Sequence, residues 1–251
     1  MDITNYLVLG LPIPIEGLGK IYQPTIQELI EHYKDVESFF TPYLISIKLY
    51  EKYFTQEILK TIKDFDLFFL VDAQGKYLIQ GREKEGLIED LVYSLTLLYK
   101  TNNVILNFEK EKIIIDNMYE INRYNFDLLS EYVMKIGMKE KIVPEKKEVF
   151  KSERKRKLYE KLEKRRAEIR RRNAPILGDF INTLANNPVR GYSYEEIRKM
   201  TIWQILKCYS EILNIDRHEQ MMKYKVSYKY NVEDEIEHWR KTNKLERVNI
   251  N

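Results

Sequence analysis

The sequence is poor in the residues that build small, stapled or loop-rich domains. It has one cysteine, Cys208, in 251 residues. A single thiol excludes an intrachain disulfide and a zinc site built from several cysteines, and it fits a reducing compartment. Nine glycines and seven prolines are few for this length, which argues against an all-β fold with many tight turns.

Histidine is equally scarce, and this limits metal and acid–base chemistry. The chain has three, at positions 32, 218 and 238. His218 and Glu219 begin like the zinc-protease motif H-E-x-x-H, but the second histidine would fall at Met222. We therefore predict no metal site.

Other catalytic signatures are also missing. Residues 17–20 contain glycine and lysine but lack the spacing and the Ser or Thr of a phosphate loop. Cys208 has no histidine near it in sequence that could activate a thiolate. We predict a protein that is not an enzyme and binds no cofactor. An enzyme whose site is assembled from distant residues is a third hypothesis, after the two binding functions given below.

The chain lacks a long hydrophobic run. Its apolar stretches, such as residues 67–71, are too short to span a bilayer. Residues 1–4 carry no basic segment followed by an apolar core, so we expect no secretory signal. These absences predict a soluble protein without a membrane partner.

Charge, by contrast, is abundant and uneven. Residues 139–172 contain sixteen Lys or Arg and seven Asp or Glu, a balance of +9, whereas the whole chain carries +3. The remainder therefore sums to −6. Such asymmetry indicates an arm or a docking surface for an acidic partner. Residues 153–172 contain no Gly or Pro, and their apolar residues Leu158, Leu162 and Ile169 form one narrow stripe. This pattern predicts a long exposed helix that joins two bodies.

The positive side chains of this helix are candidate partner-binding residues. Across residues 139–172, seven acids interleave with the basic residues in sequence, and only Phe150 and Tyr159 could offer aromatic stacking. We therefore favour a solvated strut or a protein-docking helix over a nucleic-acid contact, which is the alternative. The candidates are Arg154, Lys155, Arg156, Lys157, Arg165, Arg166, Arg170, Arg171 and Arg172.

Hydrophobic periodicity and capping boxes at Thr25, Ser193 and Thr201 predict a mainly α protein with some strand, of the α+β class. We expect an N-terminal α+β domain at 1–138 with a small β-hairpin, a charged connecting helix at 139–173, and a C-terminal helical domain at 174–251. The expected elements are an extended segment at 6–15, a strand at 20–23, helices at 25–40, 43–54, 55–63 and 84–100, a hairpin at 104–116, and helices at 123–136, 153–172 and 176–184. Two helices should follow the caps at Ser193 and Thr201, the second reaching 214, and further helices are expected at 216–226 and 232–241, with a frayed end.

Three short segments, taken in order, resemble one group of proteins. They are residues 19–28 (GKIYQPTIQE), 122–127 (NRYNFD), and 194–197 (YEEI) with 200–204 (MTIWQ). The chain thereby resembles tail-assembly chaperones and baseplate-hub assembly proteins of bacteriophages from Gram-positive hosts. The resemblance implies a non-enzymatic component of an oligomeric assembly, located in the virion or in the host cytoplasm. Its partners would be other tail or baseplate proteins, the tape-measure protein among them.

Large apolar residues in the last of these segments are candidate anchors for a partner helix. They are Tyr194, Ile202 and Trp203. The alternative, which we favour, is that each packs in the core, because buried aromatic and aliphatic side chains are usually structural.

Overall fold

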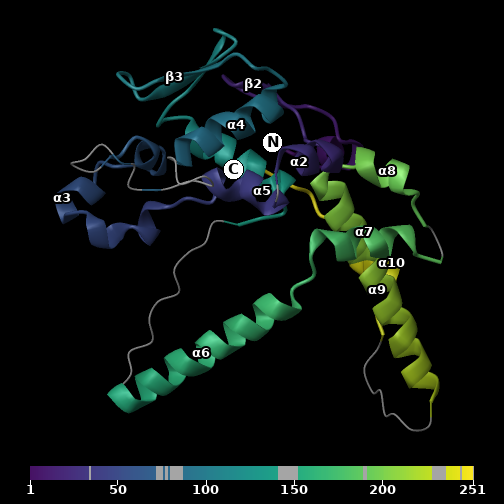
Figure 1. Ribbon diagram of the computed structural model, residues 1–251. Helices are drawn as coiled ribbons and strands as arrows, with labels where there is room; N and C mark the ends of the chain where they lie inside the picture. Colours follow the sequence, from purple (N-terminus) through teal and green to yellow (C-terminus); the bar gives the residue numbers. More distant parts are fainter. Residues whose placement is uncertain are drawn as a thin grey trace.

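The computed structural model describes residues 1–33, 35–71, 76, 79, 87–140, 152–188, 191–227, 236–243 and 245–250. Helices predominate, and two small antiparallel sheets, β1-β2 and β3-β4-β5, accompany them (Figure 1). The predicted class, mainly α with α+β character, is confirmed. None of the described helices is long and apolar enough to cross a membrane.

The chain begins with a helix where we expected an extended segment. Helix α1 (Thr4–Leu9) starts after Asp2, whose Oδ1 accepts a hydrogen bond from the Thr4 amide at 2.9 Å. Gly10, with φ +64°, ends it. Strands β1 (Ile13–Ile15) and β2 (Gly19–Ile21) then form a hairpin. Pro12 and Pro14, which favour an extended chain and led us to expect one, lie beyond the helix, so the prediction was wrong for residues 6–9.

The segment after β2 forms short helical elements, mostly 3-10 helix, where three helices were expected at 25–40, 43–54 and 55–63. Helix α2 (Ile26–His32) has the predicted capping box but ends early, because Tyr33 is extended. The short elements that follow restart at side-chain caps from Asp35, Ser46 and Thr55. They are η1 (Val36–Tyr43), η2 (Ile47–Leu49), η3 (Glu51–Tyr53), α3 (Gln56–Leu59) and η4 (Asp64–Phe68).

The middle of the chain agrees closely with the sequence pattern. Helix α4 (Leu87–Tyr99) is followed by β3 (Val104–Asn107) and β4 (Lys112–Ile115), which pair in the predicted hairpin. A third strand, β5 (Tyr119–Ile121), was not predicted. It forms because Asp116 and Asn117 turn the chain with φ of +51° and +54°. Helix α5 (Phe126–Ile136) ends at Gly137, as expected.

An aromatic cluster fills the core between these elements. Tyr43 stacks on Phe126 with ring centroids 6.2 Å apart, and Phe39 meets Phe40 edge to face at 4.9 Å. The Tyr43 hydroxyl is fully buried and hydrogen-bonds Ser94 Oγ at 2.6 Å. Burial raises the pKa of Tyr43, against the opposing effect of the Ser94 bond. Aromatic residues make up 12% of this chain, and part of them therefore pack its core.

Five described helices make up the C-terminal part. Helix α9 runs unbroken where two helices were expected. Residues 228–235, which include part of the helix expected at 232–241, lie outside the described residues. The five are α6 (Glu153–Asn173), α7 (Leu177–Ala185), α8 (Tyr194–Lys199), α9 (Ile202–Val226) and α10 (Trp239–Thr242).

The C-terminal helices pack directly on the N-terminal part, so α6 does not hold two bodies apart. The Ile26 amide donates to the Met200 carbonyl at 2.9 Å. The chain ends also pair: the Ile3 amide donates to the Val248 carbonyl at 2.9 Å, and the Ile250 amide to the Met1 carbonyl at 3.0 Å. The expectation of a frayed end was therefore wrong. The three-part division at 138 and 173 stays a prediction.

Candidate docking surfaces

Helix α6 stands out by its exposure. None of its described side chains is buried, and it lies below the N-terminal elements as a separate rod (Figure 1). Leu158, Leu162 and Ile169 expose 58%, 45% and 51% of their surface. Isolated exposed apolar residues are ordinary, but three on one stripe of an otherwise charged helix indicate a contact surface.

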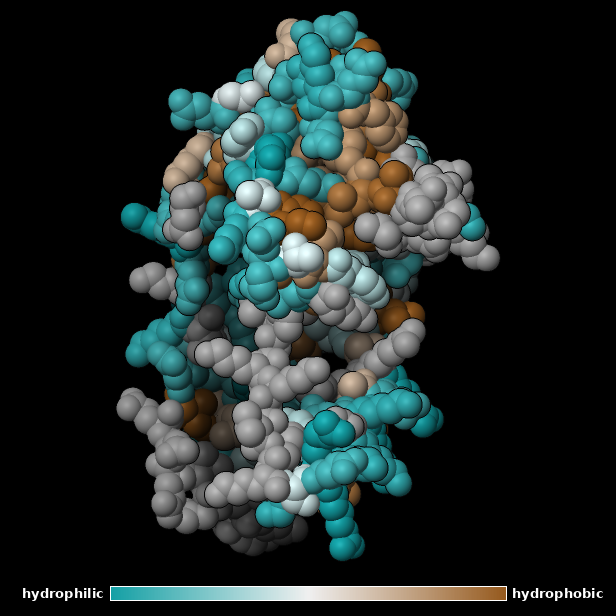
Figure 2. Space-filling model, turned by 90° about the vertical axis from the view of Figure 1, so that its left-hand side faces the viewer, coloured by the Kyte–Doolittle hydropathy of each residue, from teal (hydrophilic) through white to brown (hydrophobic). Residues whose placement is uncertain are grey.

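The same helix has a large positive net charge, whereas the rest of the chain is negative. Residues 153–173 contain eleven Lys or Arg and four Glu, a net charge of +7, so the rest of the chain carries −4. In Figure 2, the described side chains at the height of α6 are mainly hydrophilic. An acidic partner would be attracted to this helix over a range set by the ionic strength.

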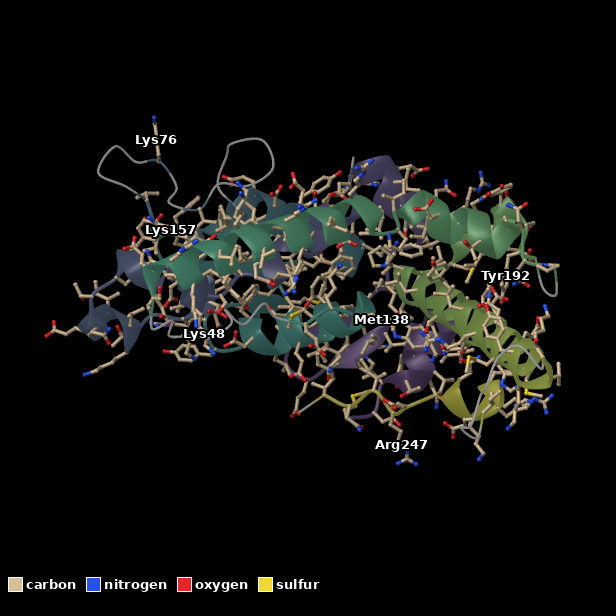
Figure 3. All side chains as sticks on the ribbon, turned by 90° about the horizontal axis from the view of Figure 1, so that it is seen from below. Lys48, Lys76, Met138, Lys157, Tyr192 and Arg247 are labelled. Carbon is tan, nitrogen blue, oxygen red and sulfur yellow. The ribbon has the colours of Figure 1, made fainter. Side chains whose placement is uncertain are left out.

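The candidate basic residues lie on helix α6, as the sequence predicted. Those whose side chains the structure describes are all exposed: Arg154, Lys155, Arg156, Lys157, Arg165, Arg166 and Arg172. Arg170 and Arg171 belong to the helix, but their side chains lie outside the described part. Lys157, near the N-terminal end of α6 in Figure 3, pairs with Glu153 at 3.1 Å. Such exposed pairs contribute little to stability, so these side chains are available for other contacts.

A second surface is a groove between helices α2, α7 and α8. Its volume is about 340 Å³. Tyr194, a predicted anchor, opens into it with 61% of its surface exposed, and Ile30 faces it with 52% exposed. The remaining lining residues are Ile26, Gln27, Glu31, Ile181, Ile197 and Arg198. Sequence reasoning missed all of these except Tyr194, because they come from three helices and share no motif.

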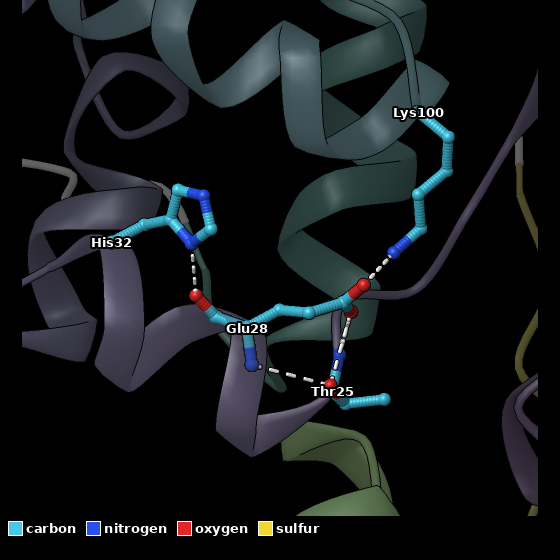
Figure 4. A network of polar contacts seen from close by, with 4 residues as sticks. All are labelled: Thr25, Glu28, His32 and Lys100. Carbon is cyan, nitrogen blue, oxygen red and sulfur yellow. Dashed lines mark hydrogen bonds and ion pairs between the residues drawn. The ribbon is translucent and has the colours of Figure 1, made fainter.

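A polar network fixes helix α2 and thus one wall of this groove (Figure 4). The Thr25 amide donates to Glu28 Oε2 at 2.8 Å, while the Glu28 amide donates to Thr25 Oγ1 at 3.3 Å. Lys100 forms an ion pair with the other Glu28 oxygen. Partial burial alone would raise the pKa of Glu28, but the hydrogen bonds from Lys100 and Thr25 outweigh it and lower the pKa.

The other two predicted anchors are not on a surface. Ile202 and Trp203 are each 5% exposed in the first turn of α9 and belong to the hydrophobic core. They point inward because Thr201, the N-cap of α9, is itself buried against the N-terminal part. In this fold they pack the core, although Trp203 also lines a hollow of about 500 Å³ beside α9. Of the three anchors, only Tyr194 is largely exposed.

A second hollow, of about 460 Å³, lies between α9, α10 and the side chains of Asn187, Pro188 and Tyr192. Cys208 lines it, with its Sγ 3.8 Å from the Tyr192 hydroxyl. His218, elsewhere on α9, places Nδ1 3.1 Å from the Glu237 carbonyl oxygen. Within the described part of the chain, no group of three or more His, Cys, Asp or Glu could hold a metal ion. We find no nucleophile paired with a base among these contacts.

Both exposed surfaces are thus suited to macromolecular contacts, one positive and partly apolar, the other an apolar groove. Their chemistry and the short segments quoted above are the basis for assigning a function. Comparison with protein-family models, with curated proteins and with solved structures found no match to this chain.

Proposed function

We propose that this chain is a non-enzymatic assembly protein of a bacteriophage tail or baseplate and works through protein–protein contacts. The observation that carries the proposal is the exposure of α6 along its described length, with three apolar side chains left in solvent. A helix gains most of its stability by packing an apolar face. In the part of the chain that the structure describes, that apolar face is left exposed, which suits a helix that meets a partner.

The groove beside Tyr194 supports a role in an assembly. It lies on helices α2, α7 and α8, whereas the exposed stripe lies on α6. A component with two separate contact surfaces can join more than one neighbour, as a subunit inside a larger assembly does. The groove also carries an exposed aromatic ring, and aromatic side chains are enriched at binding hot spots.

The resemblance to phage tail-assembly proteins supports the more specific part of the proposal. Two of the segments that carry it meet in the fold, where Thr25 of residues 19–28 pairs with Thr201 of residues 200–204. They therefore form one structural unit. We accordingly propose other tail or baseplate proteins, including the tape-measure protein, as partners, and the virion or the host cytoplasm as the location.

Cross-linking mass spectrometry on cells that produce this chain tests the proposal. Amine cross-linkers will react at the exposed Lys155, Lys157 and Lys164 of α6. We expect cross-links from these lysines to tail or baseplate proteins and recovery of the complex from assembling particles. Cross-links that lead only to ribosomal or nucleoid proteins would contradict it.

Nucleic-acid binding is the second candidate, favoured by the net charge of +7 on residues 153–173. Phosphate contacts release counterions, so the affinity for a duplex should fall steeply with salt. Fluorescence anisotropy with a labelled duplex at several salt concentrations measures this slope. The protein-contact proposal predicts only weak, sequence-independent binding that vanishes near physiological ionic strength.

A further inference from the structure

The described side chains of α6 are sorted around the helix axis, although acids and bases alternate along the sequence. With 3.6 residues per turn, neighbouring positions lie about 100° apart. On that spacing the exposed Leu158, Leu162 and Ile169 fall within about 40° of one another. We call these three residues the seam of α6.

Positive side chains border the seam on both sides. All lie within about 80° of its centre: Arg154, Lys161, Arg165 and Arg172 on one side, and Lys155 and Arg166 on the other. The described acids lie about 100° or more away: Glu153, Glu163 and Glu168. Among the described side chains, the face within about 80° of the seam centre is therefore apolar and positive. Of the described acids, Glu168 borders this face beside Lys161, and Glu153 and Glu163 lie on the back of the helix.

The seam also has coiled-coil spacing. The steps from Leu158 to Leu162, Arg165 and Ile169 are four, three and four residues, which is the alternation of d and a positions. Arg165 therefore places a charge within the apolar row, and in the same register Lys155 and Arg172 place charges at its two ends. A charged residue at such a position selects the partner and fixes the register. At 21 residues, α6 is about 31 Å long and offers about three heptads.

A second copy of α6 would not fit this face. Each copy would bring a helix of net charge +7 and would place positive flanks against positive flanks. Like charges at flanking positions oppose pairing, as they do in coiled coils. The occupant must instead supply negative charge on both sides of an apolar row.

Two other acidic surfaces fit less well. A membrane-bound helix buries a broad apolar face, whereas this seam has three apolar side chains within about 40°. A phosphate backbone would complement the flanks but would place its charges against Leu158, Leu162 and Ile169, which need apolar contact.

We propose that α6 binds an acidic amphipathic helix of another protein as a two-helix coiled coil along the seam. This rests on the proposed function in one respect only, that the chain acts through protein contacts. The partner helix presents Leu or Ile to the seam, Asp or Glu to the flanking cations, and an acid or amide opposite Arg165.

Binding of a synthetic peptide to the full chain tests this. The probe is a three-heptad peptide with leucine at a and d and glutamate at e and g, with one aspartate placed to face Arg165. The control peptide carries lysine at e and g. Isothermal titration calorimetry should show binding of the acidic peptide and none of the basic one.

Two charge-matched double variants separate the seam face from overall charge. R154E with K161E reverses the seam flank, while K157E with K164E reverses the back of the helix. We expect the flank variant to lose at least tenfold in affinity for the acidic peptide and the back variant less than threefold. The variant L162N with I169N should lose at least tenfold without any change in net charge. Circular dichroism verifies that α6 remains helical.

Equal losses from the two charge variants would overturn the proposal, because they would indicate non-specific attraction. A DNA duplex, or vesicles containing anionic lipid, could instead bind more tightly than the acidic peptide, with an affinity that L162N with I169N leaves unchanged. That result would also overturn the proposal. If the acidic helix binds as described while cross-links reach no tail or baseplate protein, the phage assignment fails and the α6 site stands.

Discussion

The backbones of Thr25 and Thr201, each the N-cap of a helix, pair with each other in an isolated antiparallel bridge. The pairing joins the start of α2 to the start of α9, and the Ile26 amide adds a hydrogen bond to the Met200 carbonyl at 2.9 Å. Each threonine also closes a complete capping box. The two caps therefore order their helices and attach the C-terminal helices to the N-terminal part.

Replacing Thr201 by alanine should destabilise the fold. The Gln204 amide, which donates to Thr201 Oγ1 at 3.3 Å, would lose its acceptor. Loss of an N-cap costs about 1 kcal/mol. Urea unfolding should show a decrease of this size in the free energy of unfolding. Thr201→Ser keeps the oxygen and should retain most of the stability; an equal loss in both variants would mean that the cap is unimportant.

Gly19 and Gly17 offer a matched pair for testing close packing. Both have positive φ, +78° and +74°, so alanine strains the backbone at either position. At Gly19 an added Cβ would lie 2.4 Å from Tyr119 Cζ, whereas at Gly17 it meets nothing within 4 Å. We expect Gly19→Ala to lower the free energy of unfolding by about 1 kcal/mol more than Gly17→Ala. Equal losses in urea unfolding would contradict this packing of β2 against β5.

The features that the sequence predicted are those set by local chemistry. The capping boxes at Thr25, Ser193 and Thr201 all form, because a hydroxyl and a carboxylate or amide three residues apart close the same ring in any context. The hairpin and α6 follow equally from composition and period. The positive, exposed surface of α6 was therefore predictable.

The features that were missed depend on contacts between distant residues. The pairing of Ile3 with Val248 joins the two ends of the chain, and no local pattern indicates it. The groove beside Tyr194 takes its walls from three helices. The sorting of charges around α6 was present in the sequence, but it is visible only when the acids are placed on a helix and not counted along the chain.

The decrease in the free energy of unfolding at acid pH should depend in part on Glu28. Its pKa is lowered in the folded chain, where Lys100 and Thr25 hydrogen-bond the carboxylate against the effect of burial. The folded state therefore binds this proton less readily than the unfolded chain. The ionised Glu28 carboxylate therefore stabilises the fold at pH values above the pKa that it has in the unfolded chain. This contribution is lost as the pH falls through its lower pKa in the folded chain.

Glu28→Gln tests this linkage. Gln can still accept in the capping box but cannot pair as an anion with Lys100. We expect the variant to be less stable than the original chain at about pH 7, and by a smaller margin at about pH 3, because the contribution of the carboxylate is lost as the pH falls through the lowered pKa of Glu28. Urea unfolding at the two pH values measures the difference.

Glu195→Gln is the control. Arg198 and Lys199 lower the pKa of that exposed carboxylate, but solvent screens the ion pairs, so the change in the free energy of unfolding should be small. A constant difference for Glu28→Gln at both pH values would exclude the ionic contribution.

Trp203 and Tyr194, both candidate anchors from the sequence, should behave in opposite ways when truncated. Trp203 is 5% exposed and Tyr194 is 61% exposed. Trp203→Ala removes a large buried side chain and should cost about 3–5 kcal/mol, whereas Tyr194→Ala should change the free energy of unfolding by about 0.5 kcal/mol or less. Thermal and urea unfolding of the two variants measure this contrast. If Trp203→Ala kept full stability, the indole would not be part of the core in solution and would be free to contact a partner. If the contrast holds, Tyr194→Ala becomes the substitution that perturbs the α2–α7–α8 groove in a folded chain, so a partner that depends on this groove can be identified by its loss.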